Sequence, residues 1–102
     1  MKQIKQTNGR NETTTAMFYK GNDMVAQIIM TRRFVDDKFD IGSLTINYHG
    51  NSIPIGECVY HEEDGLMKTY GSFLTMFENI IDFDEYFTQI NTTYTFKKVG
   101  DE

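Results

Sequence analysis

The hexapeptides YKGNDM (Tyr19–Met24) and YHGNSI (Tyr48–Ile53) share one pattern: an aromatic residue, any residue, Gly-Asn, any residue, and an aliphatic residue or Met. Glycine adopts positive φ freely and asparagine tolerates it, so Gly-Asn between alternating apolar residues is a strong signal for a two-residue hairpin loop. The repeated pattern therefore predicts that the chain turns twice, at Gly21-Asn22 and at Gly50-Asn51.

The alternation of apolar and polar residues around each turn predicts a register. For the first hairpin it pairs Tyr19 with Met24 and Met17 with Ala26, with Ile28 and Met30 continuing on the same face. For the second hairpin it pairs Tyr48 with Ile53, Ile46 with Ile55 and Leu44 with Glu57. We therefore expect an antiparallel meander with four strands, near residues 14–20, 24–34, 43–49 and 52–60.

A helical period replaces the alternation from Asp64 onward. Apolar residues recur every three or four positions and draw one stripe along four to five turns: Leu66, Tyr70, Phe73, Leu74, Phe77, Ile80 and Ile81. Asp64 is the expected N-cap, and Glu62 and Glu63 suit the positive end of the helix dipole. The stripe is expected to cover the apolar face of the sheet.

Three further segments complete the predicted fold. VDDKFDIGS (Val35–Ser43) is expected to be a solvated loop, and its acids Asp36, Asp37 and Asp40 lack the spacing of a calcium loop. DFDEYFTQI is expected to form a short helix capped by Asp84, and NTTYTFKKV alternates like an edge strand. The predicted fold class is α+β: an antiparallel sheet of two hairpins plus a C-terminal strand, packed on one main amphipathic helix.

The length of 102 residues predicts a single domain over residues 1–102, in which residues 1–13 form a flexible N-terminal arm.

Cys58 is the only cysteine, which excludes an internal disulfide and suits a small buried strand residue. No apolar run reaches the roughly 20 residues of a membrane helix, and the basic N-terminus lacks the apolar segment of a signal peptide. We expect a soluble protein in the cytoplasm.

The sequence contains no signature of an enzyme, a metal site or a cofactor site. His61 stands beside Glu62 and Glu63, but adjacent residues in a turn point in different directions, so an acid–base cluster is not expected. The cations Lys2, Lys5 and Arg10 fall in the predicted arm, and Arg32-Arg33 point to opposite faces of a strand, which argues against direct nucleic-acid binding. The expectation is a protein without catalytic activity, metal or cofactor.

Negative charge is concentrated in one third of the chain. Residues 57–85 hold eight of the fifteen acids and a single Lys, whereas the whole chain carries a net charge of −5. Carboxylates at a helix end, with aromatic residues beside them, can bind a partner with a basic surface. The predicted partner-binding residues are Glu62, Glu63, Asp64, Glu78, Asp82, Asp84, Glu85 and Tyr86; Glu57, Phe83 and Phe87 belong to the same segment.

A short acidic chain without enzyme motifs or a secretion signal, rich in Asn, Ile, Lys and Tyr/Phe, resembles the small bacteriophage proteins that inhibit host defence, including the anti-CRISPR type. The resemblance is one of kind, not of motif, and carries over no residue. It implies a phage protein that acts inside the host cell and binds the basic nucleic-acid groove of a host defence nuclease, with acids in the place of phosphates.

Two other functions compete with this one. A module that binds a small molecule or a nucleotide signal between sheet and helix would use Arg32, Arg33 and His49. A structural phage protein would self-associate, as a dimer or larger assembly, through a seam of Thr92, Tyr94 and Phe96 in the last strand.

Overall fold

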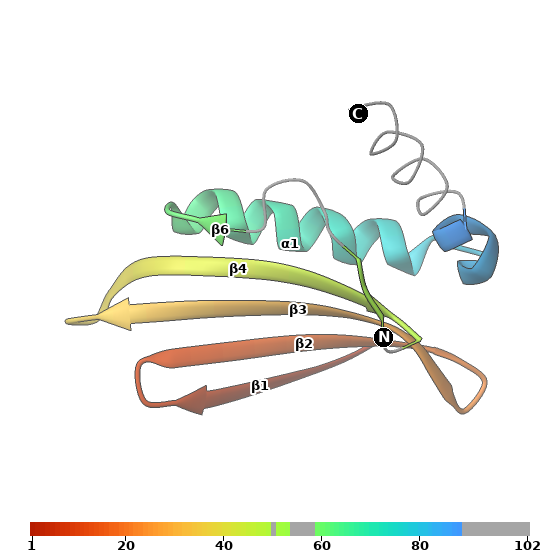
Figure 1. Cartoon of the computed structure of the whole chain (residues 1–102), viewed down its shortest axis with the longest axis horizontal. Helices are drawn as coiled ribbons and strands as arrows, with labels where there is room; N and C mark the ends of the chain where they lie inside the picture. Colours follow the sequence, from red (N-terminus) through yellow and green to blue (C-terminus); the bar gives the residue numbers. More distant parts are fainter. Residues whose placement is uncertain (50, 54–58, 89–102) are drawn as a thin grey trace, which may run out of the picture.

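A computed structural model describes residues 1–49, 51–53 and 59–88 of the chain. Six antiparallel strands form one sheet in the order β1-β2-β3-β4-β5, with β6 paired to another part of β4. One long helix, α1, packs beside β4 with its axis along the strands, and residues 83–88 are helical again (Figure 1). The fold class is the predicted α+β. The elements are β1 (Lys2–Asn8), β2 (Asn11–Lys20), β3 (Asp23–Val35), β4 (Lys38–Tyr48), β5 (Asn51–Ile53), β6 (Val59–Tyr60) and α1 (Glu63–Glu78).

The first predicted turn is confirmed. Lys20 pairs with Asp23, so Gly21 and Asn22 form a two-residue loop, and Gly21 has a φ of 64°. Tyr19 pairs with Met24 as predicted, and Ile28 and Met30 lie in the core. The predicted pairing of Met17 with Ala26 is wrong. Val25 is an extra residue, a β-bulge, between the pairs Phe18–Ala26 and Tyr19–Met24. Because Phe18 now lies opposite Ala26, Phe18 is buried instead of Met17.

The second predicted turn is displaced by one residue. Tyr48 pairs with Asn51 and Ile46 pairs with Ile53, so the turn begins at His49, which has a φ of 49°. The predicted pairing of Tyr48 with Ile53 is therefore wrong by two residues. The shift is even and keeps the same residues on the core face of β4, because side chains alternate with a period of two. Gly50, Ile55, Glu57 and Cys58 lie outside the described residues, as does the predicted C-terminal strand.

The predicted flexible N-terminal arm is instead largely an edge strand. β1 pairs with β2 along its whole length, from Lys2 opposite Met17 to Asn8 opposite Asn11, and Gly9 turns the chain with a φ of 63°. Seven residues of backbone pairing outweigh the high polarity of this segment, which is exposed on both faces. Polarity alone therefore suggested an arm where backbone hydrogen bonds form a strand.

The predicted loop over VDDKFDIGS is also wrong. Val35 pairs with Lys38, and Asp36 and Asp37 form a two-residue hairpin loop with φ values of 51° and 63°. Positive φ at both positions is the geometry of a type I′ turn, which Asp tolerates better than most residues. The strand predicted over 43–49 therefore begins earlier, at Lys38, and Asp40 lies inside it as a bulged residue.

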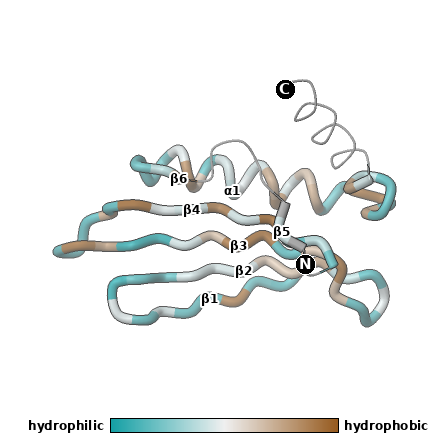
Figure 2. Tube along the Cα trace, in the orientation of Figure 1, coloured by the Kyte–Doolittle hydropathy of each residue, from teal (hydrophilic) through white to brown (hydrophobic). Residues whose placement is uncertain are grey.

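The core lies between α1 and one face of the sheet. The helix contributes Leu66, Tyr70 and Phe77 to it, as its predicted stripe requires, while Phe73, Leu74 and Ile80 are half-buried at its margin. The sheet contributes the alternate residues Ala16, Phe18, Ala26, Ile28, Met30, Leu44 and Ile46. Figure 2 shows the hydrophobic stretches recurring along β3 and β4, while the turn between β1 and β2 is hydrophilic.

Gly42 allows α1 to approach β4 closely. A Cβ atom at this position would overlap the Leu66 side chain and would lie 2.9 Å from the carbonyl oxygen of Thr31. Leu66 is fully buried at this contact. The glycine is therefore required by packing and not by backbone conformation.

Both ends of the helical region differ from the prediction. α1 begins at Glu63 with Glu62 as its N-cap, so Asp64 lies in the first turn and does not cap the helix. The helix ends before Ile81, which is fully exposed and outside the predicted stripe. Within the described residues, no helix is long and apolar enough to cross a membrane.

The second helix is capped two residues earlier than predicted. The backbone N–H of Glu85 donates to Oδ1 of Asp82 at 3.1 Å, so Asp82 and not Asp84 caps residues 83–88. Phe87 from this helix is fully buried, stacks on Tyr48 with ring centroids 4.4 Å apart, and meets Phe77 edge-on at 5.6 Å. These aromatic contacts fix the second helix against α1 and the end of β4.

Candidate functional site

The predicted acidic residues do not form one surface. Glu62, Glu63 and Asp64 lie at the N-terminal end of α1, whereas Glu78, Asp82, Asp84 and Glu85 lie at and beyond its C-terminal end. Sixteen helical residues separate the two groups by about 24 Å. The two groups therefore occupy opposite ends of the molecule (Figure 1).

The N-terminal group is partly neutralised. Arg32 of β3 donates from Nη1 to Oε2 of Glu63 at 2.8 Å and also hydrogen-bonds Glu12 of β2. The Arg32 and Glu12 side chains are only 14% and 15% exposed. This network joins two strands to the first turn of α1, which gives Glu63 a structural role and leaves Glu62 and Asp64 exposed beside it.

The C-terminal group contains two structural carboxylates. Asp82 caps the second helix, and its backbone oxygen accepts from the N–H of Tyr86 at 3.1 Å. Asp84 accepts a hydrogen bond from the Tyr48 hydroxyl and lies 3.5 Å from Nε2 of His49. These contacts tie the second helix to the end of β4.

Glu78 and Glu85 are the unengaged carboxylates of this end. Both side chains are exposed, and neither takes part in an ion pair or side-chain hydrogen bond among the described residues. Between them in the sequence stands the fully exposed Ile81. We call the set Glu78, Ile81, Asp82, Asp84 and Glu85 the acidic corner.

The acidic corner has a fixed backbone. The N–H of Asn79 donates to the Met76 carbonyl at 3.1 Å, and the N–H of Ile80 donates to the Phe77 carbonyl at 3.3 Å. A shallow hollow of about 400 Å³ adjoins the corner, lined by Asn79, Ile80, Ile81, Asp82, Glu85 and Tyr86. An apolar side chain is thus held outward beside carboxylates on a corner that needs little ordering to bind.

Tyr86, predicted to be an exposed anchor for a partner, is half-buried. Its hydroxyl contacts Sδ of Met76 at 3.3 Å, and burial raises the pKa of that hydroxyl above its ordinary value. Phe83 is also half-buried, and Phe87 belongs to the core. The aromatic residues of this segment therefore mainly pack inside the molecule, because the second helix turns their ring faces toward α1.

The three residues predicted for a small-molecule site do not converge. Arg32 is held by Glu12 and Glu63, and Arg33 donates from Nε to Asp40 at 2.8 Å. His49 follows β4, seven residues beyond Gly42, which pairs with Arg32, so it lies about 23 Å along the strand from that position. Among the described residues, no group of three His, Cys, Asp or Glu side chains has an arrangement that could hold a metal.

The sequence reasoning missed two features of the surface. The helical spacing of apolar residues predicts that Ile81 belongs to the buried stripe, but α1 ends before Ile81 and its side chain is exposed. The second feature is a groove between the β1–β2 and β3–β4 hairpin tips, whose residues are distant in sequence.

Comparison of the chain with protein families, with curated proteins and with solved structures finds no match.

Proposed function

We propose that this chain is a non-enzymatic inhibitor of the phage type, which acts in the host cytoplasm on a nuclease of a defence system such as a CRISPR effector. The acidic corner occupies part of the basic groove that otherwise holds nucleic acid. Carboxylates replace phosphates as partners of the Lys and Arg residues in that groove, and Ile81 enters an apolar socket among them.

One observation carries the proposal: a fully exposed isoleucine stands on a corner fixed by hydrogen bonds, together with Glu78 and Glu85, which have no charged partner among the described residues. Protein interfaces combine an apolar centre with a charged rim, and this corner presents both kinds of side chain. The fixed backbone supports rapid, electrostatically steered association, since little of the site must be ordered on binding.

The proposal is tested by charge reversal at two residues whose side chains make no ion pair or hydrogen bond within the described part of the chain. Glu78→Lys combined with Glu85→Lys reverses the corner without removing the Asp82 cap or the Asp84 contact with Tyr48. The double variant is expected to lose about 2–4 kcal/mol of binding free energy to a CRISPR effector nuclease, with the larger loss in association rate. The measurements are a binding titration at two salt concentrations and a DNA-cleavage assay across a panel of effectors.

Glu62→Lys with Asp64→Lys is the matched control, because it reverses two exposed acids at the opposite end of α1. This control should bind and inhibit almost as the unaltered chain does. If it fails while the corner variant remains active, the interface lies at the other end of the helix. If no effector in the panel is bound or inhibited by the unaltered chain, the proposed partner class is wrong.

A further inference from the structure

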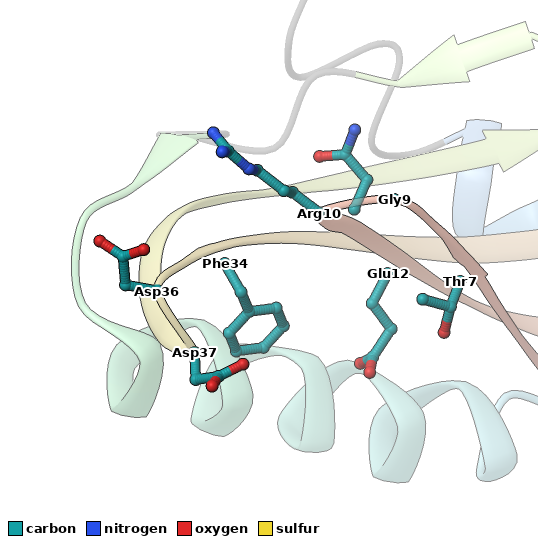
Figure 3. A pocket seen from close by; sticks show the side chains of 8 residues that line it. Thr7, Gly9, Arg10, Glu12, Phe34, Asp36 and Asp37 are labelled. Carbon is teal, nitrogen blue, oxygen red and sulfur yellow. The ribbon is translucent and has the colours of Figure 1, made fainter.

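A hollow lies at the end of the sheet remote from the acidic corner. It has a volume of about 570 Å³ and lies between the β1–β2 and β3–β4 hairpin tips (Figure 3). Its lining is formed by Thr7, Gly9, Arg10, Asn11, Glu12, Phe34, Asp36 and Asp37. We call it the tip groove.

Backbone contacts fix the walls of the tip groove. The N–H of Phe34 donates to the carbonyl oxygen of Arg10 at 2.8 Å, which binds the two hairpins together next to their turns. Asp36 and Asp37 belong to a two-residue turn that is clamped by the pairing of Val35 with Lys38. The groove is therefore built into the sheet and is not a gap between loosely placed loops.

Two lining residues already recognise a guanidinium group within this chain. The Cζ atom of Arg32 lies 5.2 Å from the centre of the Phe34 ring, and Arg32 donates from Nε to the Glu12 carboxylate at 3.1 Å. An aromatic ring together with a carboxylate is the pairing that binds organic cations in proteins. Phe34 and Glu12 also line the tip groove.

Glu12 is already paired with Arg32 and Lys5, so the carboxylates that favour a cation at the groove are those of Asp36 and Asp37. Asp36 and Asp37 are exposed and take part in no ion pair among the described residues, so they add two unneutralised carboxylates to the wall. Figure 3 shows the Phe34 ring lying between the carboxylates of Asp37 and Glu12, while the side chain of Arg10 points away from the ring. Arg10 is the only cationic residue among the described residues of the lining, and the Arg32 guanidinium outside the lining lies 5.2 Å from the centre of the Phe34 ring.

We propose that the tip groove binds an alkylguanidinium or alkylammonium group, with the cation between Asp37 and the Phe34 ring. The groove takes either a free organic cation or an Arg or Lys side chain of a peptide, since both present the same chemistry. This site does not rest on the proposed inhibitor function, because it lies at the opposite end of α1 from the acidic corner.

The test compares butylguanidinium with butylurea, a neutral molecule of nearly the same shape, in titrations of the full chain followed by amide NMR shifts. Butylguanidinium should give saturable shifts at residues 9–12 and 34–37, and butylurea should give none there. Equal shifts with both molecules, or no saturable shift with butylguanidinium, would overturn the proposal.

Asp37→Asn is the decisive variant, because Asn keeps the preference for positive φ and removes only the charge. It should weaken butylguanidinium binding by about five- to tenfold, and Phe34→Leu should weaken it by a similar factor. Asp23→Asn, next to the turn at the other end of the sheet, is the control and should leave binding unchanged. Unaltered affinity in both Asp37→Asn and Phe34→Leu would show that the cation binds elsewhere.

Two further probes distinguish the sources of the cation. Agmatine represents a free organic cation, and a blocked Gly-Arg-Gly peptide represents a protein side chain. Tighter binding of the peptide at residues 9–12 and 34–37 assigns the groove to a protein partner, and tighter binding of agmatine assigns it to a small molecule.

Discussion

Arg32 and Glu63 join the sheet to the helix through a hydrogen bond of 2.8 Å between residues that are 31 positions apart in the sequence. The same guanidinium binds Glu12, so one half-buried cation serves two carboxylates. Arg32→Met keeps most of the packing volume and leaves Glu12 without its main partner. We expect it to reduce the free energy of unfolding by about 1–3 kcal/mol in urea denaturation, because a shielded charge loses its compensation.

Glu63→Gln is the contrasting variant for this network. The Glu63 side chain is 39% exposed, so Glu63→Gln should reduce the free energy of unfolding by less than about 1 kcal/mol. Equal losses for Arg32→Met and Glu63→Gln would mean that the contact with Glu12 adds nothing.

The pKa of Glu12 makes part of the stability dependent on pH. Burial raises this pKa, but hydrogen bonds and charge from Arg32 and Lys5 outweigh burial and hold it below its ordinary value of 4.5. A pKa lowered by folding stabilises the native state above the unfolded pKa, and this contribution disappears as the pH falls through the folded pKa. Glu12→Gln should therefore lower Tm at pH 7 and make a smaller difference at pH 3. A Tm difference that grows on acidification would contradict this assignment.

Gly42 is expected to be intolerant of any side chain. Gly42→Val would place atoms where Leu66 and the Thr31 carbonyl now lie, so we expect a loss of about 1–3 kcal/mol in thermal or urea denaturation. Gly71 in α1 is the control, because no atom lies within 4 Å of its added Cβ. Gly71→Ala should stabilise the protein by about 0.5–1 kcal/mol, and a loss there would indicate that α1 is packed more tightly than described.

Phe77→Ala and Phe73→Ala are expected to differ in their cost to stability, although both residues belong to the predicted apolar stripe. Phe77 is 1% exposed and touches the rings of Phe18 and Phe87, so Phe77→Ala should cost about 3–5 kcal/mol. Phe73 is half-buried at the margin of the core, and Phe73→Ala should cost about 1–2 kcal/mol because less apolar area is lost. Equal losses in urea denaturation would place both rings in the core.

Replacing Ile81 is expected to weaken binding to the partner while leaving the stability of the fold unchanged. Because its side chain is fully exposed, Ile81→Ala should change the free energy of unfolding by less than about 0.5 kcal/mol. The same variant should weaken binding to the nuclease by more than about 1 kcal/mol if the side chain fills a socket. Calorimetric titration beside thermal denaturation measures both quantities, and wild-type affinity would remove Ile81 from the interface.

By itself, the sequence determined the first hairpin turn and the main helix. Gly21 adopts positive φ between alternating apolar residues and so makes a tight hairpin turn. The apolar stripe from Leu66 to Phe77 forms one helix with one buried face. These features depend on the φ preference of a residue and on the period of its neighbours, which are properties of a short window. The α+β class followed from them, since the helix and the sheet must cover each other's apolar faces.

Only the tertiary structure decided where these elements place their charges. The bulge at Val25 changed which residues of β2 enter the core, backbone pairing made a strand of polar β1, and α1 carried the acidic residues to opposite ends of the molecule. The tip groove joins Glu12 to Asp37 across two hairpins. Each outcome depends on register and on contacts between distant residues, and in a strand one inserted residue moves the following side chains to the other face.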